Sequence, residues 1–425
     1  GSTNGPIVET GFEPAFLMIK KTNGTDNWYI VDNKRSTSNP RQAALFANST
    51  DAEWPTYTAK VDFLSNGFKI VSTDGSTNGN NDTYLYMAFA ADPDTTAPTL
   101  ADSFAVKTYS GNGGTQSLTG FGFTPSMIWT KGRTVAYDPG LYDSVRGGGS
   151  LIYPSLSQAA STVTNGIQSF DADGVTFGSN NKSNASDSTY VAWAWKADDN
   201  EPTINTGGSI NSIVSANANA GFSISNFTGT GSAGTVAHGL SSTPEFVMIK
   251  NVSNVGSWLT WHKDYGGGDK YIYLDSTNAV ATQSQFFNST VPTSSVFSVG
   301  SHGDINGNGH NVIGYCFHSV SGYSKIDSYT GNGSATGPTV TTGFQPDFVM
   351  IKRADATAGY SWYIFDSARD PSNTRSKILK ANANGAEFTV SNSIDFNATS
   401  FQPKNTDAGW NASGGTYIYL AFKIN

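Results

Sequence analysis

Histidine is the residue most often used for general acid–base catalysis, because imidazole titrates near neutral pH. All five histidines lie between residues 238 and 318 of the 425-residue chain: His238, His262, His302, His310 and His318. Catalysis by a Ser/His/Asp or Cys/His arrangement needs a histidine beside the nucleophile, so most of the chain lacks this chemistry. The single cysteine, Cys316, lies in an apolar segment that favours a buried core thiol over a reactive one. These positions predict a protein that is not an enzyme.

Acidic residues and metal ligands give the same prediction. A glycosidase needs two carboxylates, but no acidic pair recurs at a fixed place along the chain. Residues 302–309 resemble the first half of a calcium loop, yet Tyr315 stands where a bidentate glutamate is expected, so a hairpin turn is favoured. A zinc site built from His302, His310 and His318 is disfavoured, because a loop and two strand ends would have to converge. We therefore expect neither a metal nor a cofactor.

An Asp-x2-Arg spacing occurs three times, from Asp32, Asp143 and Asp366. A carboxylate and a guanidinium could share sugar hydroxyls, but an ion pair at a strand end is the favoured interpretation. The corresponding segment between residues 208 and 320 differs, and we expect ligand specificity where the copies differ, in loops 54–57, 137–141, 258–268 and 354–361. The candidate ligand-binding residues are Trp54, Tyr137, Trp261, His262, Asp264 and Tyr265.

These residues sit in a chain that repeats itself four times. A Pro-x5-Lys segment with apolar residues between its ends starts at Pro14, Pro125, Pro244 and Pro346. An apolar strand closes each copy, at residues 84–89, 190–195, 312–317 and 417–422, and an Asn/Gly/Ser turn precedes it. The copies are of domain size, too long for solenoid repeats. The predicted domains are repeat 1 (residues 1–91), repeat 2 (103–198), repeat 3 (208–320) and repeat 4 (323–425).

Repeats 2 to 4 open with a glycine-rich turn near Gly111, Gly229 and Gly331. Repeat 1 begins at Gly1-Ser2, which looks like the tail of the same opening with its preceding strand missing. This pattern predicts that the chain was cut from a longer array, with a Gly-Ser left by cloning as the alternative explanation.

The apolar runs are short, rich in aromatic and β-branched residues, and bounded by Gly, Asn, Asp and Pro. No stretch predicts a capped helix of ten or more residues. We therefore predict an all-β fold of four tandem antiparallel β-sandwich modules, jelly-roll or concanavalin-like, each with its own core. Polar joints with proline at residues 91–98 and 197–202 should separate the copies. The joint at 319–328 has no proline, so repeats 3 and 4 are expected to pack tightly.

Composition excludes some partners. The net charge is −8 and only 14% of residues are charged, which argues against nucleic acid and anionic membranes. No window approaches 18 apolar residues, so membrane insertion is not expected. The many aromatic residues, 12% of the chain, indicate a folded protein.

Several segments are similar to one repeat family, among them residues 109–113, 122–129, 141–147, 169–174 and 190–196. Residues 215–223, 237–240, 329–338 and 364–371 resemble a neighbouring variant of it. The family occurs in tail-fibre-like and other large virion proteins of marine tailed bacteriophages. This resemblance covers nearly the whole chain and implies lectin-like β-sandwich modules without catalytic residues.

The resulting functional hypothesis is a non-enzymatic virion protein, located on the virion or extracellular, which gives a tail fibre or surface appendage its reach and binds host-surface glycans. Repetition would raise the avidity of weak sugar sites. Expected partners are other virion proteins and host-surface glycans, with a homo-oligomer left open. The alternatives are a purely structural decoration or spacer protein, a bacterial extracellular adhesin, and a depolymerase.

Overall fold

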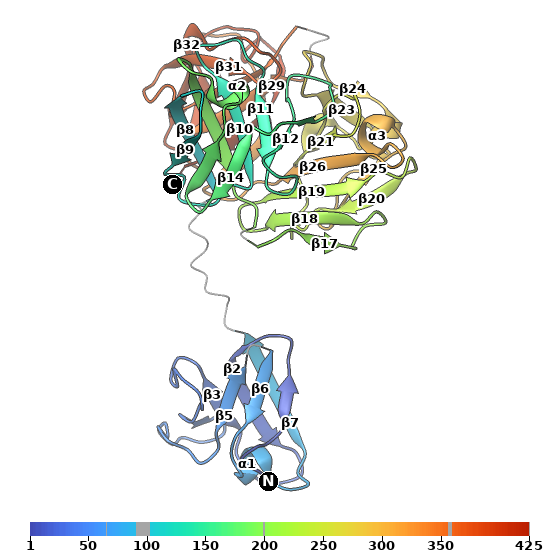
Figure 1. Ribbon diagram of the computed structural model, residues 1–425. Helices are drawn as coiled ribbons and strands as arrows, with labels where there is room; N and C mark the ends of the chain where they lie inside the picture. Colours follow the sequence, from blue (N-terminus) through green and yellow to red (C-terminus); the bar gives the residue numbers. More distant parts are fainter. Residues whose placement is uncertain (65, 91–102, 199, 356–358, 425) are drawn as a thin grey trace. The chain divides into compact units, whose positions relative to one another are not determined.

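The structure, a computed structural model, describes residues 1–64, 66–90, 103–198, 200–355 and 359–424. The predicted all-β, antiparallel fold is confirmed: every pairing between strands in these ranges is antiparallel, and the α-helices have four residues each. The chain divides into two compact units, unit 1 (Gly1–Ala97) and unit 2 (Pro98–Asn425) (Figure 1). The polar joint expected at 91–98 lies largely outside the described residues.

Unit 1 corresponds to repeat 1. It has a main sheet of order β4-β3-β2-β7 and a second sheet of order β1-β6-β5. Between them lies a core that includes Leu17, Ile19, Val31, Val61 and Phe68. The elements are β1 (Ile7–Glu9), β2 (Pro14–Lys21), β3 (Tyr29–Asp32), β4 (Leu45–Phe46), β5 (Val61–Leu64), β6 (Gly67–Ile70), α1 (Gly75–Asn78) and β7 (Tyr84–Ala90).

Repeat 2, at the start of unit 2, has a main sheet of order β11-β10-β16-β8, a second sheet β14-β15-β9 and the pair β12-β13. The elements are β8 (Phe104–Ser110), β9 (Gln116–Thr119), β10 (Met127–Gly132), β11 (Gly140–Asp143), β12 (Ser150–Leu151), β13 (Ser161–Thr162), β14 (Ile167–Asp171), β15 (Gly174–Phe177), α2 (Asn181–Asn184) and β16 (Thr189–Trp195).

Repeat 3 has an eight-stranded main sheet of order β17-β18-β19-β26-β21-β22-β23-β24, with the pair β20-β25 beside it. The elements are β17 (Thr203–Asn205), β18 (Ser212–Asn217), β19 (Phe222–Thr228), β20 (Gly234–Ala237), β21 (Phe246–Asn251), β22 (Leu259–His262), the 3-10 helix η2 (Lys263–Tyr265), β23 (Lys270–Tyr273), β24 (Ala281–Thr282), α3 (Ser284–Phe287), β25 (Val296–Val299), α4 (Gly303–Asn306) and β26 (Asn311–Phe317).

Repeat 4 is one continuous sheet of order β27-β34-β29-β30-β31-β32-β33-β28. The strands are β27 (Ser324–Thr330), β28 (Val340–Thr341), β29 (Phe348–Arg353), β30 (Trp362–Asp366), β31 (Arg375–Lys380), β32 (Phe388–Asn397), β33 (Ser400–Pro403) and β34 (Thr416–Phe422).

Equivalent strands occupy equivalent places in these sheets. The Pro-x5-Lys segments form β2, β10, β21 and β29, here called the Pro-Lys strands. Each pairs with a closing strand: β7, β16, β26 or β34. In unit 2 each closing strand also pairs on its other side with an opening strand, β8, β19 or β27.

A buried asparagine explains why an Asn-containing turn precedes every closing strand. The Asn184 side chain donates to the carbonyls of Gly178 (2.9 Å) and Gly114 (2.6 Å) and accepts from the backbone N–H of Asn112 (2.8 Å). Asn306 and Asn411 make the equivalent contacts in repeats 3 and 4. Each amide therefore ties the glycine-rich opening turn to the turn before the closing strand, and the recurring polar motif is structural.

Unit 2 has a core that its three repeats share. Each repeat also keeps a core of its own on the other face of its main sheet. The sequence led us to expect only these separate cores. The shared core contains buried side chains from all three main sheets, among them Phe104, Met127, Trp129, Trp193, Trp195, Phe222, Phe246, Met248, Tyr315, Phe317, Phe348, Met350, Leu420 and Phe422.

Burial on both faces explains why the Pro-Lys strands of unit 2 are apolar along most of their length. In β10 the side chain of Ile128 points into the core of repeat 2, while Met127 and Trp129 point into the shared core. A strand that is buried on both faces reads as a continuous apolar run rather than an alternating one.

Candidate functional site

The place where the three repeats of unit 2 meet, here called the junction, contains most of the recurring polar residues. In unit 2 the lysine of each Pro-x5-Lys segment is fully buried and donates to a backbone carbonyl of a neighbouring repeat. The bonds run from Lys131 to Asn384 (3.0 Å), from Lys250 to Ser157 (3.0 Å) and from Lys352 to Thr277 (3.2 Å). Repeat 2 thus donates to repeat 4, repeat 4 to repeat 3, and repeat 3 to repeat 2, which closes a ring.

A second set of bonds follows the same ring. Backbone N–H groups donate to carbonyls across each boundary, from Ala160 to Val252 (3.0 Å), from Val280 to Ala354 (3.0 Å) and from Glu387 to Arg133 (2.8 Å). Each donor lies three residues after the carbonyl that accepts a lysine, and each acceptor lies two residues after a lysine. The three boundaries are therefore copies of one interface, arranged with approximate threefold symmetry.

The buried lysines remain surrounded by polar backbone. Lys131 Nζ also donates to the carbonyls of Gly132 (3.1 Å) and Tyr137 (3.0 Å), and Lys352 Nζ donates to that of Tyr360 (2.7 Å). Burial lowers the pKa of Lys131, Lys250 and Lys352 to about 8 in each case. The carbonyl oxygens work in the opposite direction, because they accept hydrogen bonds from the ammonium form.

The Asp-x2-Arg motifs are ion pairs within a repeat, as favoured from the sequence. Nε of Arg35, Arg146 and Arg369 lies 2.6 Å from the carboxylate of Asp32, Asp143 and Asp366, respectively. In unit 2 the same carboxylates also accept a bond from the next repeat. Tyr315 Oη donates to Asp143 Oδ2 (2.6 Å), and Trp193 Nε1 donates to Asp366 Oδ2 (3.1 Å). Burial, together with the neighbouring Asp143 carboxylate, raises the pKa of Tyr315.

The boundary between repeats 3 and 4 departs from this arrangement at both of the residues that make the contact. His262 takes the register position of Asp143 and Asp366, opposite the second residue after the proline. Leu420 takes the register position of the donors Trp193 and Tyr315. Burial lowers the pKa of His262 to about 3, so its ring is neutral. The third boundary has therefore replaced both the buried carboxylate and its donor.

The candidate ligand residues of the 261–265 segment are mostly buried. Trp261 is 3% exposed in the core of repeat 3, and its Nε1 donates to the Gly267 carbonyl (3.0 Å). His262 is 0% exposed, and Tyr265 belongs to the shared core. Asp264 is partly exposed, and its backbone N–H donates to His262 Nδ1 (3.1 Å). Of these four candidates, only Asp264 has a polar side chain that is substantially exposed to a ligand.

The other two candidates lie apart from that segment. Tyr137 is partly buried in repeat 2, where Lys182 Nζ lies 5.4 Å from the centre of its ring. Trp54 belongs to unit 1, is half exposed and meets Tyr57 edge to face at 6.1 Å. Four of the six predicted residues therefore lie together, in segment 261–265, and the other two lie elsewhere. Ligand binding by these six residues stays a prediction. Residues 356–358 of loop 354–361 lie outside the described residues.

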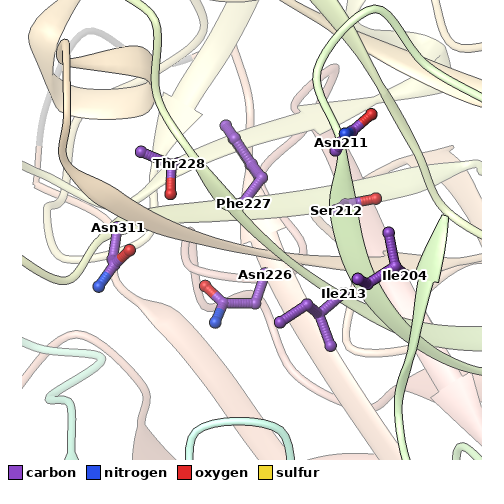
Figure 2. A pocket seen from close by; sticks show the side chains of 8 residues that line it. All are labelled: Ile204, Asn211, Ser212, Ile213, Asn226, Phe227, Thr228 and Asn311. Carbon is purple, nitrogen blue, oxygen red and sulfur yellow. The ribbon is translucent and has the colours of Figure 1, made fainter. Parts of the chain in front are cut away.

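A shallow hollow of about 240 Å³ lies on repeat 3, across β17, β18, β19 and the start of β26. Figure 2 shows Ile204 beside Ile213, Asn226 next to Ile213 on the neighbouring strand, and Asn311 at the other end. Its lining residues are Ile204, Asn211, Ser212, Ile213, Asn226, Phe227, Thr228 and Asn311. Asn226 Oδ1 is buried and has no hydrogen-bond partner among the described residues. Amides and hydroxyls beside an apolar floor suit a small polar ligand with an apolar face.

Sequence reasoning missed this hollow, because Asn, Ser and Thr are abundant throughout the chain and no motif marks the eight residues. Within the described ranges no three His, Cys, Asp or Glu side chains are grouped to hold a metal ion. Among the same residues no helix is long and apolar enough to cross a lipid bilayer. Cys316 is fully buried, as predicted for a core thiol.

The fold and the junction define an all-β protein of tandem repeats, in which three repeats close around one shared core. The chain belongs to the family described as Domain of unknown function (DUF7483), whose profile matches residues 1–93 and 99–425. The gap between the matched ranges falls at the boundary between units 1 and 2. A search of curated proteins found no match.

Proposed function

We propose that the chain is a non-enzymatic structural and adhesive part of a virion surface appendage, built from four β-sandwich modules that correspond to the four repeats. The observation that carries this proposal is where the recurring side chains lie. The recurring lysines, aspartate–arginine pairs and asparagines of unit 2 are buried in the junction or tie turns together. What the repeats have in common therefore supports rigid assembly.

The virion assignment is supported by the resemblance of the repeats to a phage virion family. A rigid three-repeat block suits an element that projects from a particle, since it keeps its shape without a partner. A density map of the intact particle tests this part: tandem β-sandwich blocks on the particle surface are expected, and their absence from the particle would contradict it.

Adhesion is the second part of the proposal. The hollow on repeat 3 combines amide and hydroxyl groups with two exposed isoleucines, Ile204 and Ile213. Pyranose rings present one apolar face and a rim of hydroxyls, so an open site of this kind suits weak binding of a glycan terminus. Weak sites gain strength when a particle displays many copies of the chain.

A glycan array probed with the intact chain tests adhesion. We expect binding that Asn226→Ala weakens about two- to tenfold, since a neutral hydrogen bond contributes about 0.5–1.5 kcal/mol. Val255→Ser, at an exposed site of repeat 3 outside the hollow, is the matched control. A blank array would favour a purely structural spacer, an alternative consistent with the way the junction uses the recurring residues. Release of reducing sugar from a host polysaccharide would contradict the non-enzymatic part.

A further inference from the structure

The closing strand of unit 1 differs from its three counterparts. In unit 2 the strands β16, β26 and β34 each lie between a Pro-Lys strand and an opening strand. Among the described residues, β7 pairs with β2 alone and forms the edge of its sheet. One side of the β7 backbone therefore presents N–H and C=O groups that no described strand occupies, which is the geometry that accepts an added strand.

The side chains of β7 are exposed where those of its counterparts are buried. Leu85, Met87 and Phe89 are 57%, 48% and 55% exposed, and Tyr86 is 42% exposed. The aligned residues Val191, Trp193 and Trp195 of β16 are 0%, 1% and 3% exposed. Leu85, Met87 and Phe89 share one face of β7, the face that is buried in the shared core in unit 2. Tyr86 lies on the other face, with its ring centre 5.2 Å from that of Phe68. Large apolar side chains are therefore exposed beside the free edge of β7.

The opening strands of unit 2 show what occupies this edge in the other repeats. Each is seven residues long, has an aliphatic residue at its third position in the shared core, and has an aromatic residue at its sixth position in the core of its own repeat. In β8 the register places Phe104 opposite Trp195, Val106 opposite Trp193 and Tyr109 opposite Tyr190.

Unit 1 retains the residues that contact an opening strand in unit 2. Tyr109 and Tyr329 stack on Tyr190 and Tyr417, with ring centres 5.4 and 5.0 Å apart, and Tyr84 is the aligned residue of β7. The hydroxyls of Tyr109 and Tyr329 donate to the carbonyls of Ser183 and Trp410, which precede the buried Asn184 and Asn411. The corresponding carbonyl in unit 1 is that of Thr77, which precedes the buried Asn78.

The position of Gly1 fixes where the added strand would end. The Gly1 amino group donates to Asn78 Oδ1 (3.2 Å). In unit 2 the equivalent amide oxygens accept from the backbone N–H of Asn112, Thr230 and Asn332, each two residues beyond an opening strand. A strand added to β7 in the same register would therefore end next to Gly1.

We infer that the open edge of β7 is a binding site for an extended peptide segment with the pattern of the opening strand β8, aromatic-x-aliphatic-x-x-tyrosine. The segment pairs antiparallel with β7 as the fifth strand of the main sheet. Its tyrosine lies opposite Tyr84, its aliphatic residue opposite Met87 and its first aromatic residue opposite Phe89. The inference concerns unit 1 and does not depend on the proposed glycan site.

A synthetic peptide with the sequence of residues 103–111 (SFAVKTYSG), labelled at its N-terminus, provides the test with the full 425-residue chain. We expect saturable binding with one peptide per chain in fluorescence anisotropy. Hydrogen exchange should show new protection of β7 amides. A scrambled peptide, and one with alanine in place of its tyrosine, should bind at least tenfold more weakly.

Variants of the chain then locate the site. Met87→Lys should weaken binding at least tenfold, whereas Ile7→Ser, at an exposed apolar position on the other sheet of unit 1, should leave it unchanged. The peptide variants keep the test valid if Met87→Lys does not fold. Equal binding of the scrambled peptide would overturn the inference, as would no binding to the folded chain. Oligomers whose β7 amides are protected without peptide would also overturn it, since a second copy would then cover the edge.

Discussion

The main sheets of unit 1 and of the three repeats of unit 2 share a Pro-Lys strand paired with a closing strand, but these strands have different surroundings. In unit 2 both faces of each Pro-Lys strand are buried, and its lysine reaches into the next repeat. Among the described residues of unit 1, the corresponding lysine, Lys20, donates to carbonyls of its own repeat, those of Lys21, Gly24 and Asp26. One local sequence therefore serves either as a buried interface or as an open face, and the neighbouring repeats decide which.

The largest difference between the units is expected at the aspartate–arginine pairs. Asp143→Ala should lower the free energy of unfolding of unit 2 by about 3–5 kcal/mol, because Arg146 would be left as an uncompensated buried charge. Asp32→Ala in unit 1 removes the same contact at side chains that are about 20% exposed, so it should cost only about 0–1 kcal/mol. Urea denaturation measures both. Equal losses would show that the surroundings of the pair do not matter.

A smaller difference is expected at two aligned methionines. Met248 is 2% exposed in the shared core, and Met248→Ala should cost about 2–5 kcal/mol. Met18 has the same place in β2 but is partly exposed, so Met18→Ala should cost clearly less. The chemical change is identical, which makes each variant the control for the other. A larger loss for Met18→Ala would contradict the different surroundings described for the two strands.

The smallest effect per residue is a pH dependence that the buried lysines give unit 2. Buried Lys131, Lys250 and Lys352 have a pKa of about 8, below the ordinary value near 10.4 that the unfolded chain restores. Between these values the unfolded state binds more protons, so the free energy of unfolding rises with pH from about 8 to 10. Each lysine should contribute about 2 kcal/mol across this window, since one pKa unit is worth about 1.4 kcal/mol.

Lys250→Met checks this dependence, because it should remove about one third of the slope between pH 8 and 10. Urea denaturation at several pH values gives the slope for both proteins. A slope that is unchanged in the variant would show that the carbonyls around the ammonium groups cancel the effect of burial.

The fold was predictable from the sequence to the level of strands and repeats. The Pro-x5-Lys segments are strands, the Asn turns precede closing strands, and Cys316 is a core thiol. The shared core was not predicted, although Met127-Ile128-Trp129 already shows an apolar side chain on both faces of one strand. A strand with one solvent-exposed face would alternate apolar and polar residues, so this continuous apolar run already indicates a second buried face.

The candidate site was predicted less well, for a physical reason. His262 differs from Asp143 and Asp366, and the sequence alone favours such differences as marks of ligand specificity. In the structure the change goes with Leu420, which replaces the donors Trp193 and Tyr315. The two positions are 158 residues apart in the sequence (420 − 262), so only the packing of repeats relates them. The hollow on repeat 3 is made of common polar residues and carries no sequence signal.

The head-to-tail order of the lysine bonds also limits how such an array can change its length. Deleting repeat 3, for example, would leave Lys352 without the Thr277 carbonyl and the Ser157 carbonyl without Lys250. Unequal recombination between copies would therefore keep the closed block intact only when it adds or removes three repeats at once. A single extra repeat would stay outside the block, with its apolar face exposed.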